Sequence, residues 1–116
     1  MPRTLIVDDS EQFLVSAERL LGVGGVRIVG TARSKSEAVR LVEERRPDLV
    51  LVDIDLGGES GLDLARDLAA LVPAPIVVLI STHTEAEVGE MVASSPAAGF
   101  IPKSRLDAAA VRAFLV

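Results

Sequence analysis

Four apolar runs in this chain each end at polar residues whose side chains could take part in chemistry. These residues are Asp8 with Asp9, Asp53, Ser81 and Lys103. If the runs are parallel strands, their polar ends meet at the carboxyl edge of one sheet, which is where open α/β sheets bind ligands. Carboxylates suit a hard cation such as Mg²⁺, and a lysine beside a hydroxyl suits a phosphoryl group. The pattern therefore predicts a shared site for a cation and a phosphoryl group.

Each of these residues has a plainer interpretation when it is taken alone. An Asp pair ahead of a helix often supplies an N-cap, and a lone lysine at a turn is usually exposed to solvent. Asp53 is harder to explain this way, because it ends a run of four apolar residues and its carboxylate should be partly desolvated. A cation held between Asp9 and Asp53, or an ion pair between Asp53 and Lys103, would offset that cost. The joint occurrence at four strand ends is what favours a site.

The elements that would position these residues can be predicted from hydrophobic periodicity. Short β-rich runs predict strands, and longer runs with apolar residues at helical spacing predict helices. The predicted strands cover 3–7, 26–30, 49–52, 76–80 and 99–101, and the predicted helices cover 11–21, 36–45, 61–71, 85–93 and 104–115. Residues 54–60 are expected to form a loop that contains glycines.

Five successive βα units predict an α/β fold with a parallel five-stranded sheet. The runs 49–52 and 76–80 are apolar throughout, as expected of strands that are covered on both faces. Right-handed crossovers leave few topologies, and the order 2-1-3-4-5 places strands 3–7 and 49–52 side by side at the switch point. We therefore predict a flavodoxin-like (βα)5 three-layer sandwich, with residues 1–116 forming a single domain.

The composition excludes several classes of function. The 116 residues are 49% hydrophobic, which excludes a disordered chain. The chain has no cysteine, so disulfides, thiol catalysis and cysteine-based zinc sites are excluded, and His83 is its only histidine. A net charge of −5 disfavours direct binding of nucleic acid by this domain. Neither a signal peptide nor an apolar run near the ~20 residues of a membrane span is visible, so a cytoplasmic protein without a membrane contact is expected.

The ordered set of motifs resembles the receiver domain of response regulators in two-component signalling, over nearly the whole chain. The matching segments are Val7-Asp8-Asp9, Pro47-Asp48-Leu49-Val50-Leu51-Val52-Asp53, Gly61-Leu62-Asp63, Leu79-Ile80-Ser81 and Gly99-Phe100-Ile101-Pro102-Lys103-Ser104. The last segment, with Ala98 before it, is similar to the LuxR/NarL-type subgroup. Regulators of that type usually carry a C-terminal DNA-binding domain, so the chain is expected to be either a stand-alone receiver or part of a longer regulator.

The resemblance implies that Asp53 is the phosphoacceptor. It also implies a Mg²⁺ ion held by Asp8, Asp9 and Asp53, with the backbone carbonyl of Asp55 as a further ligand. The chain would then be a phosphoacceptor switch with possible self-dephosphorylation, and not an enzyme that turns over an external substrate.

Further roles follow from the same resemblance. Ser81 would hydrogen-bond the bound phosphoryl group, and Lys103 would neutralise it. Phe100 matches the aromatic switch position of the family, although an aromatic core residue would look the same in the sequence. Asp55 and His83 match positions that tune dephosphorylation, with an ordinary surface role as the alternative for His83.

The resemblance also implies partners. A sensor histidine kinase or a phosphotransfer protein would supply the phosphoryl group, and the segments 85–93, 99–101 and 104–115 would form the face for an output partner or a homodimer. Segment 85–93 contains Gly89 and ends shortly before Pro96, so its intrinsic helical stability is low. Low stability suits an element that switches.

Two positions depart from the family pattern. Thr82 stands where a small residue such as alanine is usual, which would narrow access to Asp53. Ser104 replaces the proline that commonly follows the lysine. The Lys103–Ser104 bond is therefore expected to be trans, because a cis bond without proline costs ~3–4 kcal/mol.

Three other functions are weaker matches. Residues 53–55 also resemble the nucleophile motif of haloacid-dehalogenase-type phosphatases, but the acidic pair lies upstream and Gly57 replaces the expected Thr or Val. The glycines at 22–25 follow a helix, which is the wrong context for a dinucleotide site. A receiver-like interaction module that works without phosphorylation stays open as the alternative, although the complete acidic set and Lys103 argue against it.

Overall fold

A five-stranded parallel sheet with strand order β2-β1-β3-β6-β7 forms the centre of the chain. The strands are β1 (Arg3–Val7), β2 (Arg27–Ala32), β3 (Leu49–Asp53), β6 (Ile76–Ser81) and β7 (Gly99–Pro102). The computed structural model describes residues 2–115, so the two end residues of the predicted domain, 1 and 116, lie outside the described part. Counted among these five strands, the order is the predicted 2-1-3-4-5, and the predicted flavodoxin-like α/β class is confirmed.

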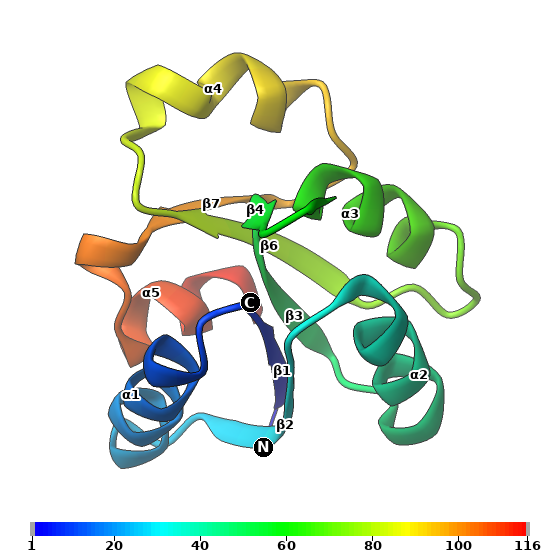
Figure 1. Cartoon of the computed structure of the whole chain (residues 1–116). Helices are drawn as coiled ribbons and strands as arrows, with labels where there is room; N and C mark the ends of the chain where they lie inside the picture. The colour runs from blue at the N-terminus through cyan, green and yellow to red at the C-terminus, as the bar shows by residue number, and fades with distance from the viewer. Residues whose placement is uncertain (1, 116) are drawn as a thin grey trace.

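Helices cover both faces of the sheet (Figure 1). They are α1 (Glu11–Val23), α2 (Lys35–Arg45), α3 (Gly61–Ala69), α4 (Glu85–Ala93) and α5 (Ala108–Arg112). Helices α1 and α5 contribute to one buried apolar cluster, and α2 and α3 contribute to the other. None of the helices in the described part is long and apolar enough to cross a membrane.

Strand β3 shows why the central runs are apolar without interruption. Its side chains alternate between the two faces, and both faces are covered. Val50 and Val52 belong to the cluster under α2 and α3, whereas Leu49 and Leu51 belong to the cluster under α1 and α5. The next residue, Asp53, therefore lies at the carboxyl end of the central strand, where the neighbouring side chains are buried.

The predicted helix over 104–115 is wrong, because the structure divides this segment into three short pieces. A 3₁₀ turn (Lys103–Arg105) follows β7, and Leu106 is extended, with φ −70° and ψ 118°. The Asp107 side chain then accepts a hydrogen bond from the Ala110 N–H at 2.8 Å and starts α5, which ends in a second 3₁₀ turn (Ala113–Leu115). The extended Leu106 points its side chain into the core, and a helix restarts only where Asp107 caps it.

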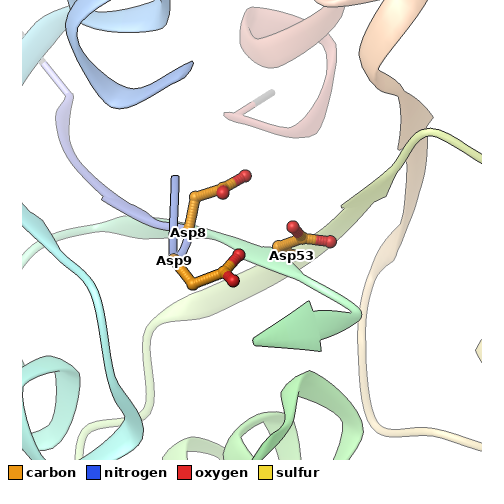
Figure 2. Close-up of side chains that lie close together, drawn as sticks. All are labelled: Asp8, Asp9 and Asp53. Carbon is orange, nitrogen blue, oxygen red and sulfur yellow. The ribbon is translucent and has the colours of Figure 1, made fainter. Parts of the chain in front are cut away.

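The predicted loop over 54–60 contains a small hairpin. Strands β4 (Asp55–Leu56) and β5 (Glu59–Ser60) pair antiparallel around Gly57 and Gly58. Gly57 has φ +67°, a conformation that glycine adopts without strain. The first strand of the hairpin, β4, begins two residues after Asp53 and lies beside the carboxyl end of β3 (Figure 2).

Helix α4 is the least buried of the longer helices. Val88 is its only buried residue, and a Cβ at Gly89 would meet no atom within 4 Å. Its first turn is nevertheless well capped, since Thr84 and Glu87 form a reciprocal capping box. The helix is locally well formed but weakly buried against the sheet, and the low intrinsic stability expected of segment 85–93 stays a prediction.

Candidate functional site

The carboxyl ends of β1 and β3 bring three carboxylates together, as the sequence predicts (Figure 2). One oxygen each from Asp8, Asp9 and Asp53 can be chosen so that all three lie within 4.8 Å of one another. Asp8 is fully buried, Asp53 is 5% exposed, and Asp9 is exposed. Two desolvated carboxylates and one solvated carboxylate therefore share the edge of the sheet.

Backbone contacts fix Asp53 from the loop that follows it. The Asp55 N–H donates to Asp53 Oδ1 at 3.1 Å, and the Gly61 N–H donates to the Ile54 carbonyl at 2.8 Å. A Cβ on Gly61 would lie 1.9 Å from the Asp53 carbonyl oxygen, which no real side chain permits. Glycine at position 61 therefore lets the start of α3 pack directly against the backbone of Asp53.

The acidic pair is held by the start of α1 and by a basic residue after β2. The Ser10 N–H donates to Asp8 Oδ1 at 2.9 Å, and the Ser10 hydroxyl accepts from the Phe13 N–H at 3.2 Å. The Arg33 guanidinium donates to the Asp9 carbonyl from two nitrogens, at 3.3 and 3.2 Å. The backbone of the pair is thus restrained while the Asp9 side chain stays accessible.

Lys103 bridges the two buried carboxylates. Its Nζ lies 2.7 Å from Asp8 Oδ2 and 3.0 Å from Asp53 Oδ2, and its side chain is 16% exposed. The predicted ion pair with Asp53 is confirmed, and the contact with Asp8 was not predicted. The Lys103–Ser104 bond is trans as expected, since Val72–Pro73 is the one cis bond recorded for residues 2–115.

Burial and charge shift the acid–base properties of this cluster. Burial raises the pKa of Asp53 to about 6, helped by the neighbouring Asp8 and opposed by hydrogen bonds from Asp55 and Lys103. Burial alone would lower the pKa of Lys103, but its contacts with Asp8 and Asp53 raise it above the ordinary lysine value. Lys103 is therefore a permanent cation, and Asp53 is ionised at neutral pH at a cost in free energy.

An open cavity of about 270 Å³ gives access to this cluster. Its lining residues are Asp9, Asp53, Asp55, Gly57, Ser81, Thr82, His83 and Lys103. The cavity thus contains most of the predicted site residues. Thr82, which departs from the family pattern, lines it and is exposed.

The ends of β6 and β7 place the remaining predicted residues. Ser81 is 2% exposed, and its hydroxyl accepts a hydrogen bond from the His83 N–H at 3.0 Å. The His83 ring is exposed and lies 3.4 Å from Glu87 in the first turn of α4. Phe100, on β7, is half-buried and packs against the cluster under α2 and α3. The structure places Ser81 at the site and His83 at its border with α4, and it leaves their predicted roles open.

The donor set fits a hard divalent cation. Carboxylate oxygens are the preferred ligands of Mg²⁺, which usually keeps several waters and takes one or two protein carboxylates. Asp8, Asp9 and Asp53 supply such oxygens from two directions, and the exposed Asp9 leaves room for water. The residues present therefore fit the predicted ion, with Asp8 and Asp53 already partly neutralised by Lys103.

A second contact of Lys103, with an aromatic ring, was also not anticipated from the sequence. The Phe13 ring lies beneath the lysine, with Lys103 Nζ 4.3 Å from the ring centroid. The spacing of Phe13 with Leu14 and Ala17 indicates only a core-facing helix position. The two residues are far apart in the chain, and only the sheet order brings them together.

Comparison with known protein families shows that most of the chain matches a single family. Residues 4–113 match the family model described as the response regulator receiver domain. The transcriptional activator ExaE of Pseudomonas putida is 34% identical over 110 residues, which are 94% of this chain and 51% of that protein. The chain spans between 23% and 51% of the length of such curated relatives.

Solved structures show the same fold. The signal receiver domain of the putative response regulator NarL from Mycobacterium tuberculosis is 28% identical, with a TM-score of 0.83 over 98% of this chain and 96% of that one. A response regulator from Burkholderia pseudomallei, solved with a phosphorylated aspartic acid, a calcium ion and citrate, has a TM-score of 0.83 at 24% identity over 100% of this chain and 67% of that one.

Proposed function

The chain belongs to the response regulator receiver family, and we propose that it works as a phosphoacceptor switch with Asp53 as the acceptor. The observation that carries this proposal is the contact of one lysine with two buried carboxylates, one of which ends β3. A nucleophile, a cation site and a permanent positive charge are then available at one open cavity.

In the proposed reaction an Asp53 carboxylate oxygen attacks the phosphorus of a phosphohistidine. The new P–O bond makes an acyl phosphate, the P–N bond breaks, and the leaving imidazole takes up a proton. Since the pKa of Asp53 is about 6, its carboxylate is mostly ionised at neutral pH and able to attack. Lys103 supplies positive charge to the transferring oxygens, and a Mg²⁺ ion held by Asp8, Asp9 and Asp53 would supply more.

Two further observations support this assignment. The Burkholderia pseudomallei relative, which shares the fold, was solved with a phosphorylated aspartic acid and a calcium ion. In this chain, Asp53 is positioned by the backbone of Asp55 and the tight approach of Gly61, which gives its carboxylate a fixed direction. A fixed nucleophile beside a fixed cation is what an in-line displacement requires.

The signal would pass from the phosphoryl group to the face formed by α4, β7 and α5. The acyl phosphate carries roughly −1.5 to −2 charges where the ionised Asp53 carries −1, and this added negative charge attracts the hydroxyl of Ser81. Ser81 is followed by the loop into α4, the helix with a single buried residue. We expect that loop and α4 to shift together, and Phe100 on β7 to change rotamer with them. A histidine kinase or phosphotransfer protein would be the donor, and an output partner or a second copy would bind this face.

Incubation with Mg²⁺ and acetyl phosphate, followed by intact-mass measurement, tests the proposal. We expect one phosphoryl adduct on the unmodified chain and none on Asp53→Asn. Asp67→Asn is the matched control, because it removes an exposed carboxylate of α3 that does not line the cavity and should keep the adduct. An unmodified chain that gains no adduct and binds no Mg²⁺ would instead favour an interaction module that works without phosphorylation.

A further inference from the structure

We infer that Phe13 is a positioning residue, whose ring holds the Lys103 ammonium in place at the acceptor site. The Nζ atom lies 4.3 Å from the ring centroid, within the range of a favourable cation–π contact. This inference rests on the proposed function, since the lysine has a phosphoryl group to neutralise only if Asp53 accepts one.

The Phe13 ring is positioned by the first turn of α1, which follows the acidic pair at the end of β1. The Phe13 N–H donates to the Ser10 hydroxyl, and the Ser10 N–H donates to Asp8 Oδ1. The first turn of α1 is therefore tied to the carboxylate that contacts Lys103. Ring, carboxylate and ammonium form one connected unit, although position 13 and position 103 lie at opposite ends of the chain.

The carboxylates of Asp8 and Asp53 cannot fix the position of Lys103 both before and after Asp53 is phosphorylated. Asp8 and Asp53 contact Nζ in this structure, and both also belong to the set of oxygens that fits a cation. If Asp8 held a metal ion and Asp53 carried a phosphoryl group, the lysine would lose the two carboxylates that now fix its direction and would have to be directed toward the phosphoryl oxygens instead. The Phe13 ring binds neither a metal nor a phosphoryl group, so its attraction for the ammonium persists in every state.

A purely structural role makes a different prediction. Phe13 also packs against the apolar cluster under α1 and α5, as Phe114 does. Leucine would fill that cluster nearly as well as phenylalanine but has no aromatic face for a cation. Variants that keep or remove the ring at similar volume therefore separate the two roles.

The first test measures the rate of Asp53 phosphorylation at saturating Mg²⁺ and acetyl phosphate. We expect Phe13→Leu to be roughly fivefold slower, the rate equivalent of ~1 kcal/mol of cation–π attraction, and Phe13→Tyr to stay near the original rate. Phe114→Leu is the matched control for lost packing and should not slow the reaction. In a Lys103→Met background, Phe13→Leu should have no further effect. An equal rate for the original chain and Phe13→Leu would overturn the inference, and so would equal slowing by Phe13→Leu and Phe114→Leu.

The second test needs no phosphorylation. The chain contains two lysines, Lys35 and Lys103, so lysine-selective isotope labelling gives two ε-methylene signals. Ring current should shift the Lys103 signal upfield, and the shift should disappear in Phe13→Leu while the Lys35 signal stays in place. Absence of the upfield shift in the original chain would refute the contact. If the shift is present but no adduct forms, the positioning contact stands and the phosphoacceptor function fails.

Discussion

Replacing Asp53 with asparagine should make the metal-free protein more stable at neutral pH. Two buried carboxylates, Asp8 and Asp53, share a single ammonium group at Lys103. Burial is the main cause of the raised pKa of Asp53 and repulsion by Asp8 a smaller one, so removing the charge of Asp53 relieves both, and the amide oxygen of the asparagine can still accept a hydrogen bond from the lysine. A substitution that abolishes the proposed function should thus raise the free energy of unfolding.

The size of the effect follows from the pKa of Asp53. It is about 6 in the folded protein, against a model value of 3.8 that represents the unfolded chain. Between these two values the folded state holds a proton that the unfolded state has released, so stability falls as the pH rises. Above both values the loss in the free energy of unfolding is complete and amounts to about 3 kcal/mol. This figure already includes the favourable effect of Lys103, because the pKa of Asp53 does. Below about pH 4 the carboxyl is protonated in both states, and the loss disappears.

Urea unfolding in the presence of a chelator, repeated over this pH range, measures the effect. The free energy of unfolding of Asp53→Asn should exceed that of the original chain by up to about 3 kcal/mol at neutral pH, and the two should converge in acid. Asp55→Asn is the control, because its side chain is exposed and its removal should change stability by at most ~0.5 kcal/mol. A lower stability of Asp53→Asn at neutral pH, or the same pH slope for it and the original chain, would refute the reasoning.

Two further substitutions test the packing and the charge of the site. Gly61→Ala should destabilise the fold by more than ~2 kcal/mol in urea unfolding, because its Cβ would lie 1.9 Å from the Asp53 carbonyl oxygen. Gly58→Ala has open space around the added atom and serves as its control, so equal losses would contradict this account. Lys103→Met should bind Mg²⁺ about tenfold more tightly by calorimetric titration, because it removes the cation that competes for the carboxylates. Weaker binding than in the original chain would show that the lysine does not compete.

The sequence predicts much of the site because topology determines where strand ends meet. Asp53 and Lys103 are separated by 50 positions, yet each follows a strand of a parallel sheet. Once the sheet order is inferred from the apolar runs and the handedness of crossovers, the two side chains must approach one another. The same argument brings Asp8 and Ser81 to that edge. The roles of these residues in phosphoryl transfer stay predictions, since proximity alone does not establish them.

Details that depend on side-chain reach or on short segments could not be predicted in the same way. The contact of Lys103 with Asp8, and with the ring of Phe13, depends on rotamers that no strand pattern determines. The hairpin after Asp53 does have a signal, the adjacent Gly57 and Gly58 between short extended pairs, which favours a tight turn. The sequence also contains a signal for the break before α5, because Asp107 is of a residue type that is strongly favoured at helix N-caps. Apolar residues at helical spacing on both sides of Asp107 make that signal hard to recognise.

The imbalance of charge at this site connects its stability to the proposed switch. With two buried carboxylates for one ammonium, the resting site is short of positive charge, which favours binding of a cation. A phosphoryl group on Asp53 would increase the negative charge again, and the nearby groups that can respond are the Lys103 ammonium and the Ser81 hydroxyl. Lys103 contacts the Phe13 ring, whereas Ser81 leads into α4, in which Val88 is buried and Val92 is only partly buried. The change in charge should therefore move Ser81 and the weakly packed α4 and leave Lys103 and α1 in place. The proposed switch thus depends on the fixed position of α1 as well as on the mobility of α4.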